Sequence, residues 1–181
     1  TLGDYQLQPK HIYNSLESFP KVDILCLSLK STANSSVMDY IKRTSKPNGV
    51  ILVLQNGYGL EQEIAKKFPE KTIIAGLCFL CANRTNPGEI HHLDYGMIKL
   101  GTLSKSSYST SILKQLQSIF ENAKIPIETS PSLLQARWEK LMWNIPFNGL
   151  CAILKCDTQQ LMKNSSMQKL TQEIMFEIQE A

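Results

Sequence analysis

The sequence predicts an α/β fold in which a mostly parallel, doubly wound sheet is followed by a helical segment. Three observations lead to this prediction. Short apolar runs rich in branched residues alternate with helical patterns over residues 22–80, an order typical of parallel sheets. Two further extended pieces flank residues 94–96 and indicate an added antiparallel hairpin. Beyond residue 131 the apolar residues recur with helical periodicity only.

Buried strands are expected in the first half of the chain. Each is a short, nearly continuous apolar run, which suits a strand that is covered on both faces of a parallel sheet. The runs are residues 22–30, 50–57 and 72–80. The hairpin is expected within residues 88–101, as two short strands on either side of the sequence DYG at the edge of the sheet.

Helices are expected between and after these strands. The first, residues 32–44, has an apolar stripe and ends at the breaker sequence KPNG. The longest extends over residues 132–154 and contains Pro146. Because proline has no N–H to donate to the Met142 carbonyl, it is expected to bend this helix. Other helices are expected at residues 60–68, near 111–123, after an Asp157 N-cap and from about residue 165 onward.

The composition argues against several classes of protein. Charged residues make up 19% of the 181 residues, and the formal net charge of +3 is too small to indicate binding to nucleic acid or a membrane surface. No apolar run reaches the roughly 18 residues that cross a bilayer, and the first residues are too polar for a signal peptide. The cytosol is therefore the expected compartment. The five cysteines are an odd number, so a disulfide scaffold is not expected.

Polar residues follow two of the expected strands and mark a candidate ligand site. Lys30 ends the first apolar run, and Asn56 lies in the sequence LQNGYG that ends the second. Ligands bind outside the carboxyl ends of strands in open parallel sheets, and Gly57 and Gly59 permit a close backbone approach. Taken singly, each feature is more often a simple turn or a lysine returning to solvent.

The sequence RWEKLMWNIPFNG, residues 137–149, contains a second candidate. Lys140, Asn144 and Asn148 are spaced four residues apart, so they drift by only about 40° per step and point to one side of a helix. Asn is a poor residue for a helix interior, and a solvated face would carry charges instead. The spacing alone leaves two alternatives open, a solvated face and one wall of a polar pocket.

Together, four segments resemble the 2-dehydropantoate 2-reductase (ketopantoate reductase) family: DILCLSLK, LQNGYG, NRTNPGEIHH with GMIKLG, and ARWEKLMWNIPFNGLCAIL. The resemblance covers nearly the whole chain from about residue 22. It implies an incomplete Rossmann-like dinucleotide-binding domain in residues 1–130 and the beginning of a helical substrate and catalytic domain in residues 131–181. It also implies NADPH-dependent reduction of 2-dehydropantoate, a small 2-keto acid, to pantoate on the route to pantothenate and coenzyme A. A homodimer is compatible with it.

The resemblance also implies roles for individual residues. Lys140 matches the family's general acid, which protonates the keto oxygen while NADPH delivers hydride. An ammonium suits this role because it is protonated at neutral pH and stabilises the developing alkoxide. Asn144 and Asn148 match residues that bind substrate oxygens, and Asn56 matches a residue between cofactor and substrate. The cofactor-side positions are Lys30, Asn56 and, by a looser alignment, Ala82.

Two parts of the family pattern have no match in these residues. The Gly-rich turn G-x-G-x-x-G that binds the pyrophosphate is not found in residues 1–30, where Gly3 is isolated. The later helices that carry a serine and a glutamate of the family's active site are also missing, so a fragment inactive on its own is expected. The preference for NADP over NAD therefore rests on the resemblance. A related NAD(P)-dependent 2-keto acid reductase and a non-catalytic binding module on the same fold remain as alternatives.

Two other motifs have simpler structural explanations. The sequence CFLC, residues 78–81, has the spacing of redox and zinc motifs, but it ends an expected strand and has no second pair. A buried structural role is therefore expected. His91 and His92 alternate between the two faces of a strand and cannot bind a metal from one side, so no metal site is expected.

Overall fold

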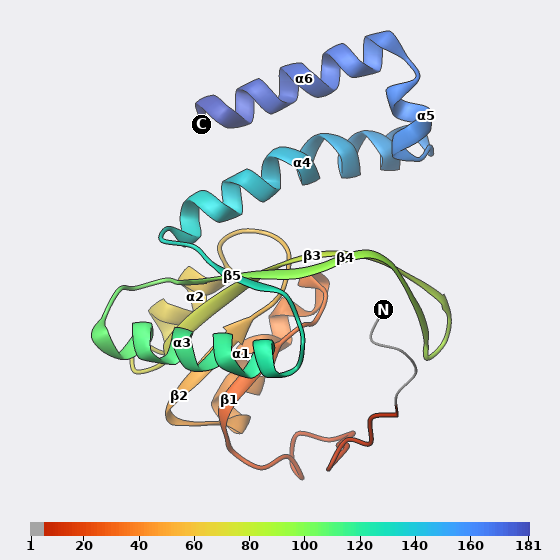
Figure 1. Ribbon diagram of the computed structural model, residues 1–181. Coiled ribbons are helices and arrows are strands. Elements are labelled where there is room, and N and C mark those ends of the chain that lie inside the picture. The colour runs from red at the N-terminus through yellow and green to blue at the C-terminus, as the bar shows by residue number, and fades with distance from the viewer. Residues whose placement is uncertain (1–5) are drawn as a thin grey trace.

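Five strands form one mixed sheet in the spatial order β1-β2-β3-β4-β5 (Figure 1). Strand β1 (Val22–Leu27) pairs in parallel with β2 (Ser45–Val53), and β2 pairs in parallel with β3 (Thr72–Asn86). Strand β4 (Glu89–Thr102) is antiparallel to β3 and parallel to β5 (Ile127–Thr129). The prediction of an α/β fold with a mostly parallel sheet and an added antiparallel hairpin is confirmed.

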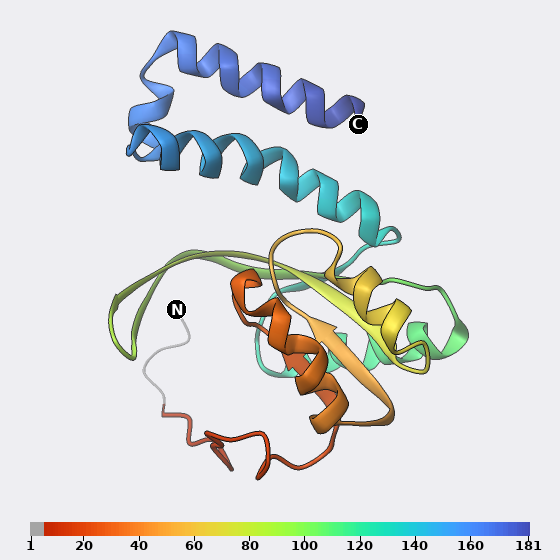
Figure 2. The ribbon, with the colours of Figure 1, turned by 180° about the vertical axis from the view of Figure 1, so that it is seen from behind.

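The computed structural model describes residues 6–181. Gly3 lies outside the described residues. Helices α1 (Asn34–Thr44) and α2 (Leu60–Lys67) cover one face of the sheet, in front in Figure 2, and α3 (Ser107–Asn122) covers the other, in front in Figure 1. A single turn of 3-10 helix leads from β1 into α1.

Alternate residues of β2 pack into two separate cores. Ile51 and Val53 lie in the core beneath α1 and α2, whereas Val50 and Leu52 lie in the core beneath α3. Successive side chains of a strand point to opposite faces. A central strand with helices on both faces must therefore be apolar at every position, which explains the continuous run in the sequence.

The last three helices form a layer beside one end of the sheet (Figure 1). Helix α4 (Leu133–Leu154) and α6 (Ser165–Glu180) pack against each other in antiparallel directions, joined by α5 (Thr158–Met162). Each helix begins at a side chain that accepts a hydrogen bond from its first turn, as N-caps do. Helix α4 continues through the buried Pro146 and bends along its length in both views.

Strand β1 is less buried than its apolar run predicts. Ile24 is 40% exposed and Cys26 is exposed, so the prediction of burial on both faces is wrong for this strand. Within residues 6–181, β1 is an edge strand, and it contributes no residue to the core beneath α3.

The antiparallel hairpin turns at a different place from that expected. Strands β3 and β4 are joined at Pro87 and Gly88, whose φ is 81°. The sequence DYG is a bulge within β4, where Tyr95 has a φ of 63° and Gly96 a φ of 127°. The two strands extend past the rest of the sheet as a long arm (Figure 1), and β5 forms the sheet edge beyond β4.

Candidate functional site

Lys140 lies on α4 above strand β3, in a half-buried position. Its Nζ donates a hydrogen bond to the carbonyl oxygen of Cys78 and lies 5.1 Å from the centre of the Phe79 ring. Burial lowers the pKa of the Lys140 ammonium; the neighbouring Cys78 opposes this shift and the charge of Arg137 adds to it. The ammonium therefore releases its proton more readily than that of an exposed lysine.

A cavity of about 410 Å³ opens beside this ammonium. Lys140 and Asn144 give it a polar wall, while aromatic and aliphatic side chains from α4 and the β3–β4 arm complete the lining. Such a cavity suits a small ligand with a polar end and an apolar part. The other lining residues are Cys78, Phe79, Leu80, Tyr95 and Trp143.

The remaining residues predicted for the site lie outside this cavity. Asn148 is exposed, one turn beyond Asn144 on α4. Lys30 is exposed just after β1, where it precedes the 3-10 helix, and Asn56 is exposed in the loop after β2. Ala82 is half-buried in β3. The structure thus brings Lys140 and Asn144 together at this cavity, and the other four positions are not among its lining residues.

Arg137 connects α4 to the loop that carries Asn56. Its Nη1 donates to the carbonyl oxygen of Gln55 at 2.8 Å, and its Nη2 forms an ion pair with the Glu61 carboxylate at the start of α2. Figure 2 shows this loop extending from the sheet toward α4. Because Arg137 lies three residues before Lys140, the loop and the lysine are held near the same part of the helix.

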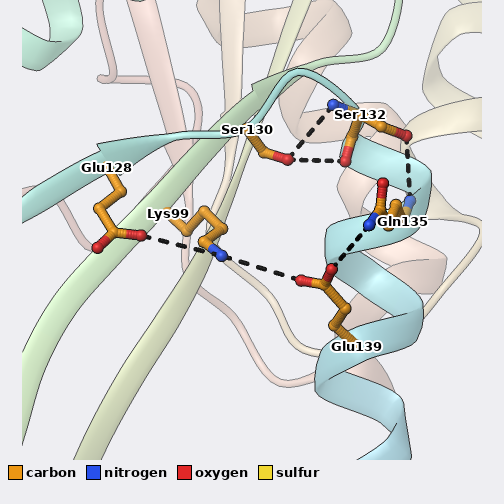
Figure 3. A network of polar contacts seen from close by, with 6 residues as sticks. All are labelled: Lys99, Glu128, Ser130, Ser132, Gln135 and Glu139. Atoms are coloured by element: carbon orange, nitrogen blue, oxygen red, sulfur yellow. Dashed lines mark hydrogen bonds and ion pairs between the residues drawn. The ribbon is translucent and has the colours of Figure 1, made fainter.

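A polar network links the start of α4 to strands β4 and β5 (Figure 3). Lys99 of β4 lies 3.9 Å from the carboxylate of Glu128 on β5 and 3.9 Å from that of Glu139 on α4. Gln135 donates to Glu139 at 3.0 Å. Since Glu139 directly precedes Lys140, this network helps to set the rotation of the helix at the lysine.

Sequence reasoning missed Arg137, its partner Glu61 and the aromatic lining. A signal for Arg137 is present, because it lies four residues after Leu133 and four before Leu141, within the apolar stripe of the helix. A charge at such a position requires a buried partner. Glu61 has no comparable signal, since acidic residues are common in the first turn of any helix.

The cysteine motif differs in part from its prediction. Cys78 is half-buried, but Cys81 is exposed, so the expected buried role is wrong for Cys81. In the part of the chain that the structure describes, no group of three or more His, Cys, Asp or Glu residues could hold a metal ion. No helix among residues 6–181 has the length and hydropathy needed to cross a membrane.

Comparisons with known proteins identify the family of the chain. The family model described as ketopantoate reductase PanE/ApbA matches residues 1–105, and the model of its C-terminal part matches residues 132–181. A protein of Nostoc sp. strain PCC 7120 named 2-dehydropantoate 2-reductase is 41% identical over an alignment of 179 residues, which covers 97% of this chain and 56% of that protein.

Solved structures have the same fold over the same part of the chain. The crystal structure of 2-dehydropantoate 2-reductase from Geobacter metallireducens GS-15 has a TM-score of 0.84 at 38% identity, over 92% of this chain and 55% of that one. The ternary structure of D-mandelate dehydrogenase with NADH and anilino(oxo)acetate has a TM-score of 0.74 at 25% identity, over 83% of this chain and 48% of that one. The chain spans about half the length of these relatives. It belongs to the ketopantoate reductase PanE/ApbA family.

Proposed function

We propose that the chain forms part of an NADPH-dependent 2-dehydropantoate 2-reductase, with Lys140 as the general acid. The observation that carries this proposal is the half-buried ammonium of Lys140 at a cavity that also contains the Asn144 carboxamide. Family membership supports the same reaction. The substrate is a small 2-keto acid, whose carboxylate and keto oxygen match the polar wall and whose carbon skeleton matches the apolar lining.

The residues after the first two strands fit a nicotinamide cofactor. Lys30 and Asn56 are exposed where the parallel strands β1 and β2 end, the edge at which open sheets bind ligands. No heavy atom lies within 4 Å of the place that a Cβ would occupy at Gly57 or Gly59, so the loop backbone is open to a ligand. We assign Lys30, Asn56 and Ala82 to hold the cofactor, which supplies the hydride when bound.

The side chains of α4 would act on the substrate. Lys140 donates its proton to the keto oxygen, and its charge stabilises the alkoxide as it forms. Asn144 and Asn148 can each donate and accept hydrogen bonds, so they can bind hydroxyl and carboxylate oxygens without adding a charge. Asn148 would contact the part of the substrate that extends out of the cavity. Phe79 and Trp143 limit the access of water to the ammonium.

The decisive experiment replaces Lys140 in a hybrid enzyme. In this hybrid the chain takes the place of the 179 matching residues of the Nostoc protein. Lys140→Ala should lower kcat for 2-dehydropantoate by about 100-fold or more, while the dissociation constant for NADPH, measured by fluorescence titration, changes little. Lys169→Ala, which removes an exposed lysine of α6, is the matched control. Unchanged turnover in Lys140→Ala would exclude this residue as the acid.

A related 2-keto acid reductase is the second candidate. It is favoured by the similarity to the D-mandelate dehydrogenase structure with NADH and by the three aromatic residues of the lining, Phe79, Tyr95 and Trp143. The test compares kcat/KM of the hybrid for 2-dehydropantoate and for the keto acid of mandelate, each with NADPH and with NADH. A preference for the aromatic acid and NADH would favour the second candidate.

We further propose that residues 1–130 form the dinucleotide-binding unit and that residues 131–181 begin the helical unit. The change from strands to helices between β5 and α4 supports this division.

We also propose that the hybrid enzyme forms a homodimer. Sedimentation equilibrium of the hybrid should give twice the mass of one chain, and a monomer at micromolar concentration would contradict it.

A further inference from the structure

Arg137 holds both ends of one loop. Its guanidinium donates to the carbonyl oxygen of Gln55, which directly precedes Asn56, and pairs with the carboxylate of Glu61 in the first turn of α2. Residues 56–59 lie between these two partners. A single side chain of α4 therefore fixes the points at which the loop leaves β2 and enters α2.

These contacts are removed from solvent. Arg137 is 4% exposed, Gln55 is 5% exposed and Glu61 is 3% exposed. A buried ion pair is often no more stabilising than apolar side chains of similar volume. Stability alone is therefore a weak reason for this pair, whereas the directional, two-pronged geometry of a guanidinium is well suited to fixing two groups in space.

The loop itself has little internal restraint. Gly57 has a φ of 109° and Gly59 a φ of 101°, values that glycine adopts readily and other residues rarely. A segment with two such glycines has many accessible conformations unless contacts restrict it. Besides the two contacts of Arg137, the ring of Tyr58 lies 5.9 Å from the ring of Trp138, the next residue of α4.

Arg137 and Lys140 are also linked through the helix. They are three residues apart on α4, about 4.5 Å along the helix axis, and Lys140 is in turn anchored to the Cys78 carbonyl of β3. From these contacts we infer that Arg137 is a positioning residue, which holds Asn56 at a fixed place relative to the Lys140 ammonium. The inference rests on the proposed function, in which these two residues act on the same bound substrate and cofactor.

The test must separate positioning from folding. Replacing Arg137 alone would leave Glu61 as an unpaired buried carboxylate and could unfold the protein. The main variant is therefore Arg137→Met/Glu61→Met, which exchanges the pair for apolar side chains. Its matched control is Arg43→Met/Asp39→Met, which removes an ion pair of 2.9 Å that is exposed on α1. Arg137→Lys is a third variant that keeps the charge without the two-pronged geometry.

In the hybrid enzyme, the main variant should keep a thermal midpoint close to that of the parent. Its kcat/KM for 2-dehydropantoate should fall at least tenfold, mostly through a lower kcat. The kcat/KM of the Arg137→Lys variant should also fall. Asn56→Ala should then lower kcat/KM by a smaller factor in the main variant than in the parent, because Asn56 is already misplaced in the main variant. A folded main variant with parental kcat/KM would overturn the inference.

Hydrogen–deuterium exchange of the 181-residue chain gives a readout without turnover. The amides of Leu54 and Glu63, which donate hydrogen bonds to the Leu27 and Gly59 carbonyl oxygens at the two ends of the loop, should exchange at least tenfold faster in the main variant and at the parental rate in the control. Unchanged exchange in the main variant would overturn the inference even if activity fell. If the unsubstituted hybrid reduces no 2-keto acid, the proposed function fails, and the exchange rates still decide whether Arg137 holds the loop.

Discussion

The Lys140 ammonium has a hydrogen-bond acceptor beside it and is partly buried. The Cys78 carbonyl accepts a hydrogen bond from the ammonium, and the Phe79 ring lies beside it. The carbonyl stabilises the charged form, while burial and the charge of Arg137 destabilise it. The lowered pKa shows that the destabilising effects prevail, which suits a group that must give up a proton in every catalytic cycle.

This environment predicts a pH dependence. In the proposed mechanism the protonated form of Lys140 is the acid, and this form is lost as the pH rises through a pKa below the ordinary value for lysine. The kcat/KM of the hybrid should therefore fall on the alkaline side, at a pH below the ordinary pKa of a lysine side chain. The effect on stability has the opposite pH dependence. The folded state binds this proton more weakly than the unfolded state, so the buried charge lowers the free energy of unfolding at low pH. This destabilisation disappears as the pH rises from the folded-state pKa of Lys140 to its unfolded-state pKa.

Lys140→Arg is the variant that checks this assignment. Guanidinium groups stay protonated throughout the accessible range, so the residual activity of this variant should lose the alkaline limb. The measurement is kcat/KM against pH at saturating cofactor for parent and variant. The same limb at the same pH in both proteins would mean that another group is responsible for it.

How far the site could be predicted depends on which geometry each residue requires. Lys140 and Asn144 lie at one cavity because helical spacing alone brings positions four apart together. Tyr95 lines the same cavity because it lies in a bulge, where its φ is 63°. An aromatic residue rarely adopts this conformation, so it could not be predicted from the sequence. The partners of Arg137 are 76 and 82 residues away in the chain, so only tertiary structure could identify them.

At the level of elements, apolar runs predict the first three strands. In β2 and β3 the run is the direct consequence of burial between helices on both faces of the sheet. The hairpin was misplaced because DYG contains residues typical of turns, while the turn that forms is at Pro87 and Gly88. The pairing of two long strands along their whole length decides between these places. Strand β5 has only three residues, too few for a periodic signal.

The contact between β4 and the start of α4 predicts a stability difference between two glycine substitutions. A Cβ at Gly101 would lie 3.1 Å from the Cβ and 3.3 Å from the Cα of Leu133, the first residue of α4. Neither atom can move without displacing the helix. Gly101→Ala should therefore lower the free energy of unfolding by about 1–3 kcal/mol.

Gly149→Ala is the matched control for this prediction. Gly149 lies within α4, and no heavy atom is within 4 Å of the place that its Cβ would occupy. Alanine has the higher helix propensity, so this variant should raise the free energy of unfolding by up to about 1 kcal/mol. Urea denaturation of both variants provides the measurement. Effects of the same sign would contradict the packing argument at Gly101.

At the scale of the whole molecule, helix α4 joins the sheet to the helical layer. Helix α4 begins inside the core beneath α1 and α2, where Leu133 and Ala136 are buried. Its later part faces α6 and carries exposed apolar residues, among them Trp143 and Ile153. The change in composition near residue 131 therefore does not coincide with the limit of the sheet's core, which extends through the first turn of α4.

Two shortened chains should consequently differ in stability. A chain that ends at residue 130 loses Leu133 and Ala136 from the core and leaves the buried Glu61 carboxylate without Arg137, a loss of about 3–5 kcal/mol for the unpaired charge alone. A chain that ends at residue 154 keeps these contacts and loses only α5 and α6. Both tryptophans lie on α4, so the shorter chain has no tryptophan fluorescence to follow. Urea unfolding of both chains should therefore be followed by far-UV circular dichroism. We expect the longer chain to unfold at the higher urea concentration, and equal midpoints would mean that α4 is not part of the sheet's cooperative unit.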